Sequence, residues 1–161
     1  MLVFGTQMHI VTFVFVVLEI AMFFYQVIYY LSRPQEKNRY WYLILLLLLI
    51  FYNITGGLFP DEKIGIPIIA QNIIAYGSGF FMASYFPFYF YKAFHLERLR
   101  FHALYGIYLF LIAPFLLFFV IEYSISRNLE NVIKHGIIIP FFYALVFVWN
   151  ILRAINAKYK G

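Results

Sequence analysis

Polar side chains recur every seven residues in an apolar stretch near the N-terminus. Thr12, Glu19 and Gln26 therefore fall on one stripe of an α-helix. If a membrane span begins near residue 8, Glu19 lies about 16 Å into it, near the middle of a bilayer. An ionisable group at that depth costs roughly 2.5–3.5 kcal/mol and usually faces the interior of a helix bundle. Two interpretations stay open: a protonated Glu19 hydrogen-bonded to a neighbouring helix, or a role in proton sensing, ligand contact or gating.

Further polar residues occur at similar depth in the next two apolar stretches. They favour a small polar cavity open to the outer side of the membrane, which a ligand would enter. In the alternative, each amide simply forms a hydrogen bond across a helix pair, worth about 0.6 kcal/mol on average. The residues of this candidate ligand-binding cluster are Thr12, Glu19, Asn53, Gln71, Asn72 and Tyr76.

The third apolar stretch carries small residues at intervals of four, Ala75, Gly79 and Ala83, a pattern that lets another helix approach closely. Pro87 removes the hydrogen bond to the carbonyl of Ala83, so we expect a bend or hinge there. A static packing feature is the alternative to a moving hinge. Pro114 and Pro140 predict further bends in the last two stretches.

Signatures of enzyme chemistry are not found. The chain has no cysteine, which excludes disulfides, thiolate metal sites and cysteine nucleophiles. The four histidines fall near the ends of apolar stretches, and their spacing fits neither a zinc-protease signature nor a haem pair. No phosphate-binding loop or nucleophile elbow is present. We therefore expect no catalytic residues, no metal, no cofactor and no enzyme activity.

The elements that would position these residues are membrane helices. Of the 161 residues 65% are hydrophobic and 12% are charged, about half the charged share of a soluble domain. A spanning helix needs roughly 20 mostly apolar residues. The sequence predicts an all-α polytopic bundle in a single transmembrane domain, residues 1–161. Its five predicted spans cover about residues 8–31, 40–59, 66–92, 102–124 and 136–155.

The basic residues predict the orientation of the bundle. Nine of them fall on one side of the predicted spans and three, Lys63, Arg127 and Lys134, on the other. The positive-inside rule places the N-terminus outside and the C-terminus in the cytoplasm, and an odd number of spans agrees. This clustering also indicates topology rather than a nucleic-acid-binding face. We expect a multi-pass protein of the bacterial inner membrane, with the lipid bilayer as its main partner.

One sequence pattern is more specific than a succession of apolar stretches. The segment "VIYYLSRPQEKNRYWYLILLLLLIFYNITGGLFP" is followed, after the third span, by "FYFYKAFHLERLRFHALYG". This order resembles the membrane region of bacterial seven-transmembrane receptors with diverse intracellular signalling modules, and the composition looks like that of Bacteroidetes proteins. The resemblance covers residues 10–155 and the first five of seven spans. It implies a membrane unit that relays a signal to a cytoplasmic kinase, cyclase or DNA-binding output, in cis or in trans.

Two departures from that family bear on the prediction. Only about seven residues precede the first span, where the family commonly has an outer sensory domain, and neither two further spans nor an output module follows "RAINAKYKG". We expect either the membrane part of a longer receptor or a five-span protein acting through partners. The leading hypothesis is a sensory, signal-transducing membrane region, a monomer or homodimer that relays a small-molecule, membrane or partner signal to a cytoplasmic output. The alternatives are an accessory or structural subunit of a membrane complex and, third, a small transporter or channel.

Overall fold

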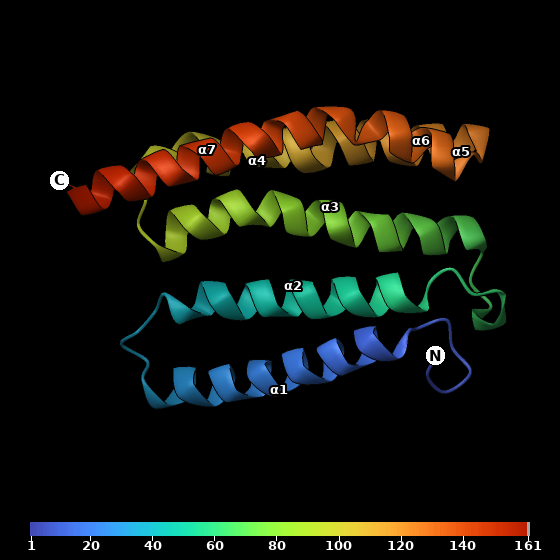
Figure 1. Cartoon of the computed structure of the whole chain (residues 1–161), viewed down its shortest axis with the longest axis horizontal. Coiled ribbons are helices and arrows are strands. Elements are labelled where there is room, and N and C mark those ends of the chain that lie inside the picture. The colour runs from blue at the N-terminus through green and yellow to red at the C-terminus, as the bar shows by residue number, and fades with distance from the viewer. Residues whose placement is uncertain (161) are drawn as a thin grey trace. The chain divides into compact units, whose positions relative to one another are not determined.

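The protein is described here by a computed structural model covering the backbone of residues 1–160 and the side chains of residues 1–159. Gly161, the end of the predicted domain, and the side chain of Lys160, one of the basic residues used for orientation, lie outside the described part. The described chain is all-helical (Figure 1). Its long helices are α1 (Ile10–Ser32), α2 (Arg39–Leu58), α3 (Ile68–Ala93) and α7 (Ile138–Lys160).

Shorter elements complete the chain. Short 3₁₀ turns, η1 (Glu62–Ile64) and η2 (Glu97–Leu99), precede α3 and α4. A run of helical residues then passes without a break from α4 (Arg100–Gly106) through the π-helical segment η3 (Ile107–Phe119) into α5 (Val120–Ser126). The helix α6 (Leu129–Gly136) leads into α7.

Four helical segments are long and apolar enough to cross a membrane: Ile10–Ser32, Arg39–Leu58, Glu97–Ser126 and Leu129–Tyr159. The third predicted span also forms a helix, α3, but does not reach this hydropathy. Polar residues lower the mean hydropathy of α3. Among them are Gln71, Asn72, Ser78 and Ser84, all of them buried. A multi-pass membrane protein with at least these four spans follows, while the fifth span and the orientation stay predictions.

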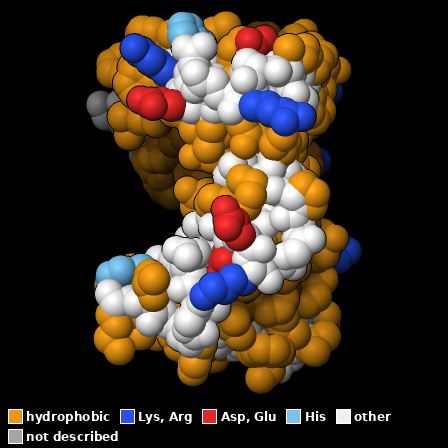
Figure 2. Space-filling model, turned by 90° about the vertical axis from the view of Figure 1, so that its right-hand side faces the viewer, with side chains coloured by type: hydrophobic (Ala, Val, Ile, Leu, Met, Phe, Trp, Pro, Cys, Tyr) orange, Lys and Arg blue, Asp and Glu red, His pale blue; other side chains and the backbone are white. Residues whose placement is uncertain are grey.

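Hydrophobic side chains cover much of the surface. Large residues such as Phe15 and Leu18 on α1, Leu117 on η3 and Trp149 on α7 are about half exposed or more. Figure 2 faces the end where the chain turns between α2 and α3, and there the charged side chains lie on the turns, with hydrophobic side chains around them. A soluble protein rarely exposes so much apolar surface, whereas lipid solvates it, so the surface agrees with a membrane location.

The chain divides into two compact units, Met1–Met82 and the part that begins at Ala83. Unit 1 contains the antiparallel pair α1 and α2, which lie side by side in Figure 1, and the first part of α3. Unit 2 contains the remainder of α3 and everything from η2 to α7. The helix α3 is continuous through the boundary.

The prolines in the last two predicted spans lie in different local settings, and the bends stay predictions. Pro114 lies inside the π-helical segment, whose wider hydrogen bonding is seen at its end, where the Val120 N–H donates to Phe115 O five residues back. The fifth predicted span begins with a break at Ile137 between α6 and α7, and Pro140 falls in the first turn of α7. A proline is tolerated there because the first N–H groups of a helix have no intrahelical partner.

Candidate functional site

The heptad stripe on α1 faces α2 along its whole length. Near its N-terminal end, a Cβ added to Gly57 of α2 would lie 3.3 Å from Thr12 Cγ2, so the glycine permits this close approach. At its centre, Asn53 Nδ2 donates to Glu19 Oε1 at 2.6 Å. At its C-terminal end, Arg39 Nη1 donates to Gln26 Oε1 at 2.8 Å. The stripe is therefore a polar seam between the first two helices, and we call these contacts the α1–α2 seam.

Glu19 is the chemically distinctive member of the seam. Its Oε1 is bonded to Asn53, but its Oε2 is buried and has no hydrogen-bond partner among the described residues. Buried polar atoms are nearly always paired, so each exception asks for an explanation. A carboxyl oxygen in this position can carry a proton or accept a hydrogen bond from a molecule that enters the seam. Chemically, Glu19 is suited to respond to such an event.

Charged side chains lie at the end of the seam that is predicted to face the cytoplasm. Arg39 donates from Nε to Glu36 Oε2 at 2.7 Å and lies over the Tyr29 ring, 3.6 Å from its centroid. Arg33 donates to the Tyr29 hydroxyl at 2.7 Å and lies 3.6 Å from Glu36 Oε1. The hydrogen bond from Arg39 holds the pKa of the Glu36 carboxyl below its usual value, and the charges of Arg39 and Arg33 act in the same direction. This network fixes the turn between α1 and α2.

Gln71 of the predicted cluster has a different set of partners. Its side chain is fully buried, and its Oε1 accepts from the Asp61 N–H at 2.7 Å. Its Nε2 donates to the carbonyls of Asp61 at 2.9 Å and Ile66 at 2.7 Å. The Asp61 side chain in turn accepts from the Lys63 N–H and caps η1. Gln71 thus fastens the turn between α2 and α3 to the start of α3.

A hydroxyl pair and a close contact at a glycine lie between the second and third helices. Thr55 Oγ1 and Ser78 Oγ are 3.0 Å apart, and both side chains are buried. A Cβ on Gly79 would lie 3.1 Å from Tyr52 Cε2, so the small-residue face of α3 brings Gly79 against α2. Gly79 was predicted as a packing residue, whereas Thr55 and Ser78 were not in the predicted ligand-binding cluster. Within unit 1 all three lie at the interface of α2 and α3.

The structure thus brings together some of the predicted site residues and not others. Glu19 and Asn53 are bonded, and Thr12 lies on the same seam. Asn72 is buried and Tyr76 is 37% exposed. Ala75 is half-buried and its carbonyl accepts from the Ser78 hydroxyl. Whether these residues bind a ligand stays a prediction.

Pro87, the predicted hinge, is fully buried in unit 2. A Cβ on Gly106 of α4 would lie 3.0 Å from Pro87 Cγ, so the proline ring packs directly against the backbone of α4. Ala83, the last member of the small-residue face, is half-buried one turn earlier. The contact with Gly106 gives Pro87 a packing role, and a hinge function stays a prediction.

A polar pair in unit 2 was not predicted. His102 of α4 is buried, and its Nδ1 lies 2.7 Å from the Tyr143 hydroxyl of α7. The ring of Phe147 lies 5.5 Å from the imidazole centroid, and Phe110 lies 5.0 Å from the Tyr143 ring. No short motif joins residues 41 positions apart, so only the fold places them together. The pair ties the two last membrane helices together inside an aromatic cluster.

The acidic and histidine side chains of the described residues are spread along the chain. No group of three or more His, Asp or Glu side chains in residues 1–159 could hold a metal ion. The polar contacts named above join side chains in pairs or to backbone groups, and the buried Oε2 of Glu19 lacks a hydrogen-bond partner among the described residues. No protein-family model matches the chain, and neither a curated protein nor a solved structure matches it.

Proposed function

We propose that the chain is the membrane-embedded sensory and signal-transducing region of a bacterial inner-membrane receptor, with its N-terminus outside. The observation that carries this proposal is Glu19. An ionisable side chain near the middle of a span is by default a functional candidate, and this one has one bonded oxygen and one buried, unpartnered oxygen. The stimulus is a proton or a small hydrogen-bond donor acting on the α1–α2 seam.

The relay from the seam follows α2 and α3. A change at Asn53 reaches Thr55 two residues later, and Thr55 is paired with Ser78 of α3. The helix α3 continues into unit 2, from which the C-terminal helix leads to the predicted cytoplasmic side. A shift of α3 would thereby reach a kinase, cyclase or DNA-binding output in cis or in trans. The resemblance to seven-transmembrane signalling receptors supports the same assignment.

The test uses the bacterium that encodes the protein. A deletion strain is complemented with the wild-type chain, with Glu19→Gln, or with Gln71→Leu combined with Asn72→Leu, and transcript levels are compared. We expect deletion to change a defined set of transcripts, which the wild type restores and Glu19→Gln does not, although membrane abundance is equal. Ser32→Ala, an exposed position at the end of α1, is the matched control. Restoration by both cluster variants would remove the sensory proposal.

The accessory-subunit alternative predicts a different mass. After gentle solubilisation, native mass spectrometry should find a monomer or homodimer if the chain is a receptor. A stable complex with other chains would favour the accessory subunit instead.

The proposed orientation has its own test, because the chain has no cysteine. Single cysteines at Lys37 and Lys63 can be labelled with a membrane-impermeant maleimide. We expect Lys63→Cys to react in intact cells and Lys37→Cys to react only after permeabilisation. The reverse pattern would invert the orientation.

A further inference from the structure

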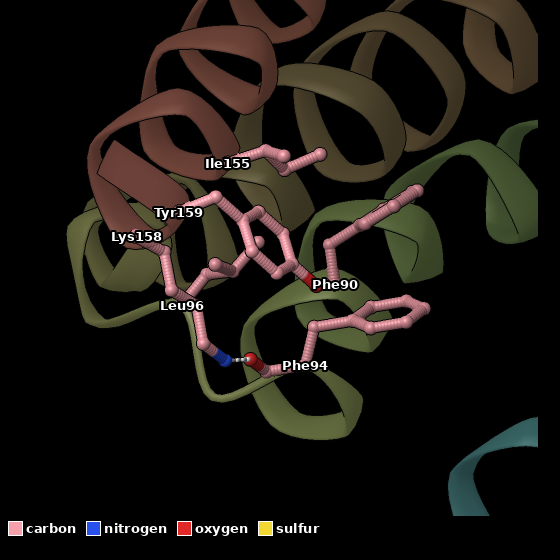
Figure 3. A pocket seen from close by; sticks show the side chains of 6 residues that line it. All are labelled: Phe90, Phe94, Leu96, Ile155, Lys158 and Tyr159. Carbon is pink, nitrogen blue, oxygen red and sulfur yellow. Dashed lines mark hydrogen bonds between the residues drawn. The ribbon is translucent and has the colours of Figure 1, made fainter. Parts of the chain in front are cut away.

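A cavity lies within unit 2 between the end of α3 and the end of α7. Its volume is about 170 Å³, room for roughly five water-sized groups at about 30 Å³ each. In Figure 3, Phe90 of α3 and Phe94, the residue after α3, line it on one side, and Ile155 and Tyr159 of α7 line it on the other. The wall is almost wholly apolar, so the cavity suits a hydrocarbon segment better than a polar molecule. Its lining residues are Phe90, Phe94, Leu96, Ile155, Lys158 and Tyr159.

One of these lining residues, Lys158, is positively charged. Lys158 Nζ donates to the carbonyl of Phe94 at 2.7 Å, the bond drawn dashed in Figure 3. This bond holds the ammonium at the cavity, close to where α3 ends. An ammonium has three N–H donors, and the bond to Phe94 uses one of them. Lys158 is exposed, so its remaining donors can meet an anionic group that lies outside the cavity.

The sequence around this end of unit 2 is strongly basic. Residues 92–100 and 153–158 contain five Lys and Arg residues and one acidic residue, Glu97. The charge there favours an anion over a cation or a neutral molecule. The basic residues are Lys92, Arg98, Arg100, Arg153 and Lys158.

Aromatic residues indicate the depth of this cavity in a membrane. The last turns of α3 read "YFPFYFYKAF", and aromatic side chains accumulate where membrane helices reach the headgroup level. With the end of α3 at that level, the ammonium of Lys158 would meet the headgroups and the apolar cavity beside it would meet the acyl chains. A molecule that fills both parts has an anionic head and a hydrocarbon tail.

We propose that this cavity binds an anionic phospholipid, with a segment of one acyl chain between Phe90, Phe94 and Ile155 and the phosphate-bearing headgroup on Lys158. Basic sites on the cytoplasmic side of membrane helices bind acidic lipid headgroups. A bound lipid would join α3 to α7, because Phe90 and Lys158 come from these two elements. The proposal does not depend on the sensory role of Glu19.

The experiment uses the full chain reconstituted in vesicles of equal parts phosphatidylglycerol and phosphatidylcholine. After extraction into a mild detergent, native mass spectrometry counts the lipids that remain bound. We expect one phosphatidylglycerol to be retained in preference to phosphatidylcholine. The preference should fall about fivefold in Lys158→Gln, since one basic residue near the surface contributes a factor of that order, and Lys158→Arg should keep it.

Two further variants separate the tail from the head. Ile155→Trp fills the cavity without changing charge and should lose the bound lipid. Lys134→Gln removes an exposed lysine of α6 outside the cavity and should behave as wild type. Circular dichroism and size-exclusion chromatography confirm that Lys158→Gln is folded. Equal retention of the two lipids by the wild type, an unchanged preference in Lys158→Gln, or displacement of the lipid by inorganic phosphate would overturn the proposal.

Discussion

Unit 1 and unit 2 are both helical and apolar, but different kinds of contact hold them. In unit 1, hydrogen bonds between side chains or from side chain to backbone connect neighbouring elements, at Glu19, Ser78 and Gln71. Unit 2 has hydrogen bonds of this kind at His102 and Lys158, and stacked rings and a close backbone contact stand beside them. Phe90 stacks on Phe94, Phe115 stacks on Phe119, and Gly106 admits the Pro87 ring.

The difference has a physical reason. Membrane helices gain little by hiding apolar surface from lipid, so they associate through close packing and hydrogen bonds. Hydrogen bonds are directional and fix register, and they also respond to protons and to polar ligands. Packed aromatic rings determine the shape of the space between helices, so an apolar molecule that fills this space can affect how the helices pack. The proposed stimulus therefore acts on a hydrogen-bonded side chain, Glu19, and the proposed lipid lies beside an aromatic ring, Phe90.

The largest expected effect comes from Gln71→Leu in unit 1. It removes three hydrogen bonds to backbone groups of Asp61 and Ile66, and at about 1 kcal/mol each the free energy of unfolding should fall by about 3 kcal/mol. Chemical unfolding in detergent micelles measures it, and hydrogen exchange should rise in residues 59–72 first. Gln35→Leu, at an exposed position, should change little. Equal stability of the two variants would contradict the role of Gln71.

A pair of glycine variants tests packing in unit 2. Gly106→Ala places a Cβ 3.0 Å from Pro87 Cγ, a buried ring that cannot turn away, and should lower the free energy of unfolding by about 1–3 kcal/mol. Gly56→Ala meets nothing within 4 Å and should raise it by up to about 1 kcal/mol, since alanine favours helix. Thermal unfolding of both variants gives the comparison. A stabilising Gly106→Ala would show that unit 2 is not tightly packed at Pro87.

The seam itself is tested by removing Asn53. Asn53→Leu leaves Glu19 without its hydrogen-bond donor, and we expect a loss of about 0.6–1.7 kcal/mol in the free energy of unfolding. The double variant with Glu19→Leu should recover the loss, because replacing both partners removes the unsatisfied group. Asn150→Leu is the control, since Asn150 Nδ2 bonds to Val146 O within its own helix. Additive single effects in this double-mutant cycle would contradict the coupling.

The smallest effect concerns pH at the turn between α1 and α2. The hydrogen bond from Arg39 lowers the pKa of Glu36 from its usual 4.5. A lowered pKa in the folded state means that the stabilisation is fully present above about pH 4.5 and is lost as the pH falls through the folded value. The protection factors of residues 33–39 in hydrogen exchange, which are corrected for the intrinsic pH dependence of the exchange rate, should therefore fall below that pH in the wild type. Glu36→Gln should remove this dependence, and an unchanged profile would contradict it.

Helix positions could be predicted from the sequence with good accuracy. The predicted spans 8–31, 40–59 and 66–92 correspond to helices 10–32, 39–58 and 68–93, because apolar runs bounded by turn residues determine local helix formation. The stripe containing Glu19 and Gln26 was likewise visible as a heptad. The partners of this stripe, Asn53 and Arg39, could not be predicted. They belong to another helix, and their contacts depend on how α2 is shifted and rotated against α1.

Periodicity and hydropathy are local properties, so they were enough to predict a helical, lipid-compatible chain and the faces on which its polar and small residues lie. Three contacts could be found only in the folded chain: Gln71 fastens a turn, His102 meets Tyr143, and Lys158 lies at an apolar cavity. Each of these contacts joins separate elements. They depend on how helices are rotated and shifted against one another, which side-chain packing between elements sets and no single segment encodes.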